Sequence, residues 1–172
     1  AKSRGSDHLY IWDIAAQRQV RDLTFEGIVA ISGPTFAPDG MRLAFAGSDR
    51  TGFTDIYIVD LKNGMAQGIR RDFYHDRQPD WSPDGKRIVF SSDRWQGGRK
   101  GFYNLFLYDI ESDAILALSH GLHNDAEPRY GPDGEYIVFS SDRDTIYNIY
   151  AVRLKEDREG RRAITQRLTR VL

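Results

Sequence analysis

The stretch Ser82-Pro-Asp-Gly-Lys-Arg-Ile-Val-Phe-Ser-Ser-Asp-Arg94 decides the fold class of this chain. Its Pro-Asp-Gly triplet is a tight-turn signature, because proline fixes φ at the first corner, aspartate caps the turn, and glycine takes the positive φ that closes the hairpin. The apolar residues that follow are adjacent and do not alternate with polar ones. Such a run is typical of a strand that is covered on both faces.

The same pattern occurs three times along the chain. The copies begin at Pro34, Pro79 and Pro128, which lie 45 and 49 residues apart, and each contains the turn, the apolar run and a Ser-Asp-Arg ending. A repeat of about 40–50 residues with about four strands is typical of a β-propeller, in which small sheets called blades stack face to face around an axis. A second apolar run follows in each copy, at 55–60, 104–109 and 148–153.

We therefore predict an all-β protein, a partial β-propeller with three full four-stranded antiparallel blades and an outer half-blade. Residues 3–13 align with a loop and the third strand of the later copies, so the first blade lacks its two inner strands. The charged segment 155–162 is expected in a turn. The half-blade is expected at 6–25, the blades at 34–71, 79–120 and 128–170, and the innermost strands at 34–37, 79–82 and 128–131.

Three blades and a half-blade cannot close a ring, because closure takes at least four blades. We therefore expect this chain to be part of a longer protein. An open run of blades leaves an apolar face bare at each end of the array, and such faces promote association. The sequence predicts self-association or low solubility for the chain by itself.

Composition excludes several classes of protein. The chain has 24 basic and 25 acidic residues and a formal net charge of −1, so it offers no field that attracts nucleic acid. No apolar run approaches the roughly 20 residues of a membrane helix, which predicts no membrane insertion. The chain has no cysteine, which excludes disulfides, thiolate zinc sites and cysteine nucleophiles.

The motif set resembles the TolB-type propeller repeat, and the resemblance runs from about Ser6 to Thr169. That repeat occurs in the periplasmic protein TolB, in tricorn-type proteases and in propellers of prolyl-oligopeptidase-family enzymes. The resemblance implies a periplasmic or secreted location. Three stretches also look like propellers fused behind metallopeptidase-like domains: Gly33-Pro-Thr-Phe, His75-Asp-Arg-Gln-Pro and Tyr103-Asn-Leu-Phe-Leu-Tyr-Asp.

Charged residues recur at fixed places in every copy. An Asp-Arg pair in each blade could form a charged binding rim, but a residue that every blade needs is more often structural, with a carboxylate that caps loop amides and a guanidinium that bridges to a neighbour. We favour the structural interpretation. The recurring residues are Asp49 and Arg50, Asp93 and Arg94, and Asp142 and Arg143, together with the turn residues Asp39, Gly40, Asp84, Gly85, Asp133 and Gly134.

Acidic residues just before two innermost strands are candidate metal ligands. Asp76 and Asp125 occupy the same register, three residues before a proline, and Glu127 lies beside the second proline. Oxygen ligands that converge on the axis of a propeller could hold Ca²⁺. The corresponding stretch of the preceding blade, 29–34, has no carboxylate. We therefore favour polar lining of the channel or capping of loops and no cofactor, with Ca²⁺ as the alternative.

The best candidate for partner binding is the longest loop between a second and a third strand. It carries Trp95, Arg99 and Lys100, and it should share a face with His75 and His123, which precede innermost strands. An aromatic residue flanked by cationic residues is typical of interface hot spots. The alternative is that Trp95 folds back onto its own blade and shields an edge.

No catalytic group stands out in this sequence. A Gly-x-Ser-x-Gly elbow is absent, and the serines at strand ends recur in the copies, which marks them as structural. We therefore predict a non-catalytic scaffold that binds a protein or peptide. The alternative is that the chain gates substrate entry in a larger peptidase whose catalytic domain lies outside this chain.

Overall fold

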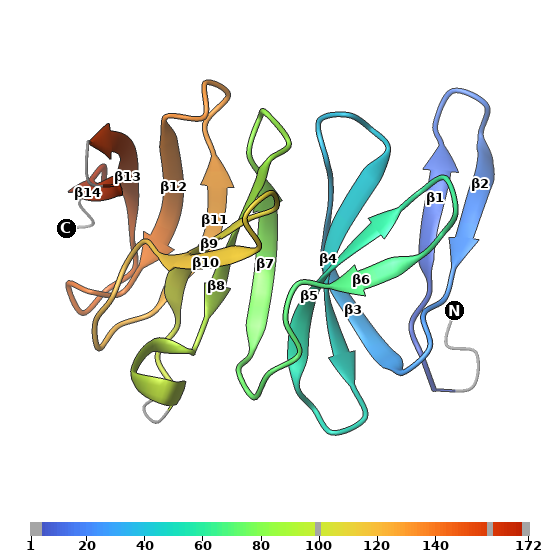
Figure 1. Cartoon of the computed structure of the whole chain (residues 1–172), viewed down its shortest axis with the longest axis horizontal. Coiled ribbons are helices and arrows are strands. Elements are labelled where there is room, and N and C mark those ends of the chain that lie inside the picture. The colour runs from blue at the N-terminus through green and yellow to red at the C-terminus, as the bar shows by residue number, and fades with distance from the viewer. Residues whose placement is uncertain (1–4, 99–100, 158–159, 170–172) are drawn as a thin grey trace.

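The computed structural model describes residues 5–98, 101–157 and 160–169, and it confirms an all-β fold built from antiparallel sheets. The β1 and β2 strands form a two-stranded hairpin, and three four-stranded sheets follow along the chain (Figure 1). The only helical segment in the described ranges is a short 3₁₀ turn, η1 (Trp95–Gly98). No described helix has the length and apolarity that crossing a bilayer requires.

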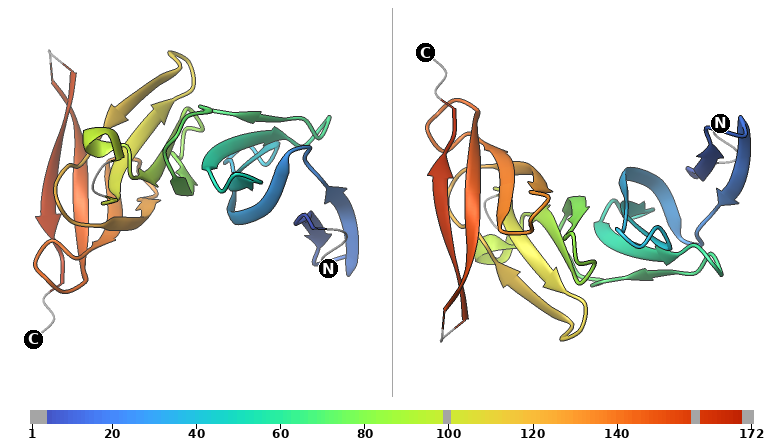
Figure 2. Two further views of the ribbon diagram at one scale, coloured as in Figure 1. Left: turned by 90° about the horizontal axis from the view of Figure 1, so that it is seen from below. Right: turned by 90° about the horizontal axis from the view of Figure 1, so that it is seen from above.

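Each four-stranded sheet contains strands in their order along the chain. The sheets fan out along an arc, which gives the radial arrangement of propeller blades (Figure 2). The hairpin consists of β1 (Leu9–Asp13) and β2 (Arg18–Leu23), and the first sheet of β3 (Ile28–Phe36), β4 (Arg42–Asp49), β5 (Thr54–Asp60) and β6 (Ala66–Gly68). The second sheet consists of β7 (Asp76–Trp81), β8 (Arg87–Ser92), β9 (Asn104–Asp109) and β10 (Ala114–Ala117), and the third of β11 (Asp125–Tyr130), β12 (Tyr136–Ser141), β13 (Asn148–Asp157) and β14 (Gly160–Arg167).

The middle strands bury both of their faces, as their adjacent apolar residues predict. On β8, the Ile88 and Phe90 side chains join a core cluster shared with the first sheet, whereas Val89 joins the cluster shared with the third sheet. On β4, Leu43 and Phe45 face the hairpin in the same way. Strands alternate their side chains between two faces, so a middle strand between two neighbours needs apolar residues at every position.

The innermost strands begin earlier than predicted, at Ile28, Asp76 and Asp125. Each of these strands contains an irregularity in register just before or at its proline, and the residue before that proline has a positive φ. Proline has no N–H to donate, so it is tolerated in a strand at such a bulge. The sequence analysis placed the start of each innermost strand at its proline, which was wrong. In the structure Asp76 and Asp125 are the first residues of β7 and β11 and do not lie in the loops before them. The left-handed residues are Gly33, Gln78 and Glu127.

The charged segment 155–162 was also predicted wrongly, as a turn. The ladder between β13 and β14 continues through Lys155↔Arg162 to Asp157↔Gly160. Strand pairing uses backbone groups, so a charged composition does not by itself prevent a hairpin from extending beyond the core.

Neighbouring sheets are joined by hydrogen bonds as well as by apolar packing. The Tyr130 N–H donates to Asp80 Oδ2 over 2.8 Å, and the Glu127 N–H donates to Gln78 Oε1 over 3.0 Å. Both bonds link β11 to β7, so they hold the innermost strands of two blades side by side. The Arg42 guanidinium donates to the Gly85 carbonyl over 3.1 Å and lies over the Trp81 ring.

The Pro-Asp-Gly turns have the conformation that their residue types favour. The Asp39, Asp84 and Asp133 carboxylates each accept a hydrogen bond from the N–H two residues later, at 2.8, 3.0 and 2.9 Å. The glycine that follows each aspartate has a φ between 65° and 73°, a region that side-chain-bearing residues rarely adopt. These glycines are Gly40, Gly85 and Gly134.

Candidate functional site

The aspartates of the Ser-Asp-Arg endings hold loops in place. Asp93 Oδ1 accepts the His75 N–H over 2.8 Å, and Asp142 Oδ1 accepts the Asn124 N–H over 2.6 Å, so each aspartate fixes the segment that leads into an innermost strand. Asp49 instead accepts the Thr51 N–H at 2.8 Å within its own loop. The hydrogen bond from the Thr51 hydroxyl is the largest cause that lowers the pKa of Asp49.

The arginines of two endings neutralise buried carboxylates. Arg94 Nη2 lies 2.6 Å from Asp76 Oδ2, and Arg143 Nη2 lies 2.8 Å from Asp125 Oδ1, while both carboxylates are fully buried. Burial raises the pKa of Asp76, and the charge of Arg94 opposes that shift. Arg50, the third member of the repeat, is exposed.

The predicted calcium ligands do not converge. Asp76 begins β7 and Asp125 begins β11, so they belong to different sheets, and each is held by its own arginine. Glu127 is exposed and two residues further along β11. In the described ranges, no group of three or more histidine, aspartate or glutamate side chains is placed to hold a metal ion. This arrangement gives the calcium hypothesis no support.

Several loops emerge at one end of the blades and form a single face (Figure 1). We define the loop face as the connections β4–β5, β6–β7, β8–β9 and β10–β11 in their described parts. Aromatic rings meet there: Phe53 contacts the Phe73 ring edge-on at 5.9 Å and stacks on the His75 ring at 5.7 Å. Phe73 is 83% exposed, and Leu122 in the β10–β11 connection is 58% exposed. The loop face therefore presents apolar groups to solvent.

Trp95 lies on the loop face but is partly buried. Its ring lies 5.2 Å from the His120 ring, and the side chain packs against the core cluster between the first and second sheets. Trp95 thus packs at the boundary between its own blade and the preceding one, and its role in partner binding stays a prediction. His123 is half-buried, with Nε2 3.3 Å from Asp125 Oδ2. Arg99 and Lys100 lie outside the described residues.

The sequence interpretation missed Phe53 and Phe73. Phe53 has a counterpart in Phe102 of the next copy, whereas Phe73 does not recur, and neither residue belongs to the turn or the Ser-Asp-Arg motif that defines the repeat. The usable signal was an aromatic residue within a polar loop, as in Arg71-Asp-Phe-Tyr-His75. These two rings line a pocket of about 340 Å³, together with Asp49, Asp55 and Asp72.

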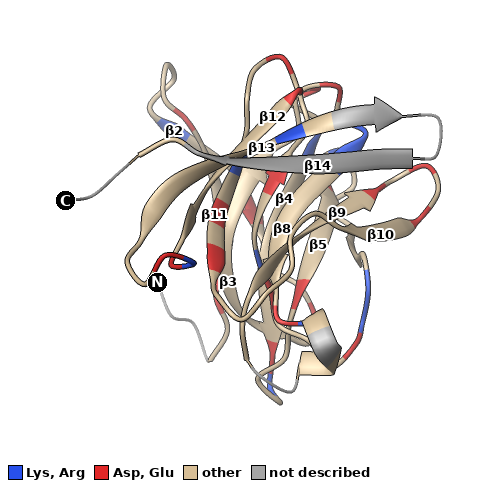
Figure 3. Ribbon diagram, turned by 90° about the vertical axis from the view of Figure 1, so that its left-hand side faces the viewer, with Lys and Arg blue, Asp and Glu red and all other residues tan. Residues whose placement is uncertain are grey.

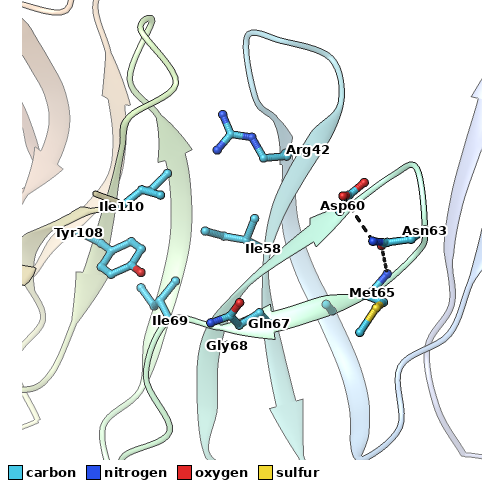
Figure 4. A pocket seen from close by; sticks show the side chains of 11 residues that line it. Arg42, Ile58, Asp60, Asn63, Met65, Gln67, Gly68, Ile69, Tyr108 and Ile110 are labelled. Carbon is cyan, nitrogen blue, oxygen red and sulfur yellow. Dashed lines mark hydrogen bonds between the residues drawn. The ribbon is translucent and has the colours of Figure 1, made fainter. Parts of the chain in front are cut away.

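A second pocket, of about 420 Å³, lies between the outer parts of the first and second sheets (Figure 4). Arg42, Asp60 and Tyr108 line it, and each has a partner. Arg42 pairs with Asp39, Asp60 accepts the Lys62 N–H, and the Tyr108 hydroxyl donates to Asp113. Each of these three polar side chains therefore has a hydrogen-bond partner within the protein. In Figure 3, both acidic and basic residues occur along the described parts of the ribbon.

Comparison with known proteins places the chain in a family. The sequence model described as the TolB beta propeller domain matches residues 2–100. The uncharacterized peptidase YuxL of Bacillus subtilis is 35% identical over 72 residues, which are 39% of this chain and 11% of YuxL. The Tol-Pal system protein TolB of Alcanivorax borkumensis is 31% identical over 64 residues, which are 37% of this chain and 15% of that protein.

Structural comparison agrees with the sequence match. A structure assigned as TolB from Agrobacterium tumefaciens superposes with a TM-score of 0.77 at 24% identity, over 99% of this chain and 57% of that one. The chain thus spans little more than half of that structure and a small part of the two curated relatives. The match to the family model covers more than half of the 172 residues, and the repeats and blade topology account for it. The chain belongs to the TolB β-propeller family.

Proposed function

We propose that this chain is a non-catalytic scaffold, and that its loop face binds a protein or peptide outside the cytoplasm. The observation that carries the proposal is the exposed Phe73 side chain on that face, which contacts the partly buried Phe53 ring. Burial of an exposed phenylalanine by a partner is favourable, because it removes apolar surface from water. Aromatic residues are also typical of the centres of protein interfaces. The resemblance to the periplasmic protein TolB supports the proposed location.

Rigid blades support the loops of this face. Asp93 and Asp142 anchor the β6–β7 and β10–β11 connections to the ends of β8 and β12. A partner that binds there meets loops that are already ordered, so less conformational entropy is lost on binding.

Selected peptides can test the proposal directly. A random peptide library would be selected on the immobilised chain, and the affinities of the selected peptides would be measured for the wild type, Phe73→Ser and Met65→Ser. Met65 is 72% exposed in the turn between β5 and β6, which makes it a control for loss of any exposed apolar side chain. We expect Phe73→Ser to weaken binding at least tenfold and Met65→Ser to change it less than twofold. Equal affinities for all three proteins would contradict the proposal.

A second candidate function is that the chain positions substrate for a peptidase domain elsewhere in a longer protein. The similarity to the peptidase YuxL favours it. A His-Glu-x-x-His or Gly-x-Ser-x-Gly motif in the flanking gene sequence would support this candidate over the scaffold. Under both candidates, the 172-residue chain should not hydrolyse fluorogenic dipeptide substrates.

A further inference from the structure

Asp55 differs from its counterparts in the other blades. It stands near the start of β5, where the second and third sheets have Asn104 and Asn148 at the start of β9 and β13. The Asn104 side-chain amide donates to the Tyr103 and His123 carbonyls at 3.1 and 3.3 Å. An ionised carboxyl group cannot donate hydrogen bonds, so an aspartate loses these contacts.

The Asp55 side chain is buried and incompletely paired. The residue is only 7% exposed, and its Oδ1 atom has no hydrogen-bond partner within the protein. The Asp72 backbone N–H bonds to the carboxyl group, so the lack of a partner concerns Oδ1 alone. A buried carboxylate oxygen without a partner is unfavourable, and each such atom calls for an explanation, such as contact with water or an ion. Asp55 lines the pocket of about 340 Å³ beneath the loop face. An external donor could complete its hydrogen bonds there.

The charges around this pocket favour a cation. Asp49 and Asp72 line it together with Asp55, and Asp76 lies close enough to act on Asp55 electrostatically. Arg94 is shared between Asp72 and Asp76, at 3.2 and 2.6 Å. Arg71 also lines the pocket and is an exposed side chain, so solvent screens its charge. One guanidinium is therefore shared by two of the four carboxylates.

The electrostatic environment of Asp55 also favours binding of a cation. Burial, and then the negative charge of Asp76, raises the pKa of Asp55 to about 6. Asp55 is therefore ionised in neutral solution, but the field around it is unfavourable to its negative charge. A bound cation relieves this field.

We propose that this pocket binds a primary ammonium group, with the Asp55 carboxylate as its anionic partner and the Phe53 and Phe73 rings beside it. Aromatic rings attract organic cations through their faces. A bare metal ion is disfavoured, because the described carboxylates do not form a group placed to hold one. A compact ammonium suits a single unpaired oxygen, whereas a guanidinium matches two oxygens side by side.

The proposed occupant is the side chain of a lysine in a bound peptide, and in this respect the inference rests on the proposed function. The same chemistry would admit a free alkylamine. Two probes distinguish these sources: n-butylammonium carries only the cation, and N-acetyl-lysine amide adds the flanking peptide groups.

The test is a calorimetric titration of the 172-residue chain at pH 8 and low salt with both probes and with n-butanol as a neutral analogue. Asp55→Asn restores the residue type of the other two blades, so the variant should fold. Glu111→Gln removes one exposed negative charge from the turn between β9 and β10 and serves as the matched control. We expect Asp55→Asn to weaken binding of the ammonium probes at least tenfold and Glu111→Gln to change it less than twofold.

A pH series separates Asp55 from its neighbours. Binding to the wild type should weaken about tenfold between pH 8 and pH 5, because Asp55 takes up a proton near pH 6. The other groups around the pocket are Asp49, Asp72, Asp76, Arg71, Arg94 and His75. Any pH dependence that remains in Asp55→Asn belongs to these groups.

The outcomes are distinct. Binding of n-butanol as tight as that of n-butylammonium, or equal binding by the wild type and Asp55→Asn, would overturn the ammonium site. Binding of the ammonium probes that depends on Asp55 would support the site, even if peptides selected on the chain proved independent of Phe73. In that case the site would stand as a small-amine site and the scaffold proposal would fail.

Discussion

Replacing Asp55 by asparagine should stabilise the protein. In the wild type, folding brings a carboxylate into a buried position where Oδ1 has no partner, and the pKa of Asp55 rises from 3.8 to about 6. One pKa unit corresponds to about 1.4 kcal/mol, so ionised Asp55 lowers the free energy of unfolding by up to about 3 kcal/mol above pH 6. Asparagine carries no charge and therefore removes this cost.

The sign of the pH dependence follows from the direction of the shift. Because the pKa of Asp55 is raised in the folded state, that state holds its proton between pH 3.8 and about pH 6 while the unfolded state has lost it. The contribution of Asp55 to stability therefore falls as the pH rises through this window, and it is constant on either side. The advantage of the asparagine variant should be largest at pH 8 and nearly absent at pH 4.

Urea denaturation followed by tryptophan fluorescence measures both effects. At pH 8 we expect the midpoint of Asp55→Asn to lie about 1 M urea above that of the wild type, for a slope of about 2–3 kcal/mol per M. At pH 4 the two midpoints should agree within error. Other aspartates whose pKa values are lowered, such as Asp39 and Asp109, reduce stability at low pH in both proteins and cancel in the comparison. A variant that is no more stable at pH 8, or a difference that persists at pH 4, would refute this reasoning.

Three further predictions concern the packing of the blades. Arg94→Ala should lower the free energy of unfolding by about 3–5 kcal/mol, because it leaves the fully buried Asp76 carboxylate without its cation. Arg50→Ala, at the exposed equivalent position, should change it by no more than about 0.5 kcal/mol, and equal effects of the two variants in thermal unfolding would contradict this prediction. Phe90→Ala should lower the free energy of unfolding by about 3–5 kcal/mol in urea titrations, since Phe90 is fully buried between two sheets. A decrease below about 1 kcal/mol would contradict the packing described for this core. The chain should self-associate in sedimentation velocity experiments, because Trp12 and Ile14 in the hairpin and Tyr147 just before β13 are exposed apolar groups; a single monomeric boundary across the concentration range would count against this.

The sequence by itself determined the blade architecture, because the features that specify it are local. Pro-Asp-Gly favours a turn through the conformational preferences of three adjacent residues. A strand with consecutive apolar residues, such as 88–90, indicates burial of both of its faces. Because the same local pattern occurs three times, it predicts three similar sheets that stack as blades. The same repetition indicated the aspartates and arginines that make structural contacts within two of the blades: Asp93, Arg94, Asp142 and Arg143.

Only the tertiary structure decided how the copies differ. Gln78 and Glu127 adopt a left-handed conformation at β-bulges that the residue types there do not predict. Because of these bulges, the innermost strands begin earlier in the chain than the sequence predicts. The exposure of Phe73, the partial burial of Trp95 and the unpaired Asp55 oxygen all depend on segments that are distant in sequence. Burial and pairing are properties of neighbours in space, and a repeat in one dimension does not specify which neighbours a loop or a single carboxylate meets.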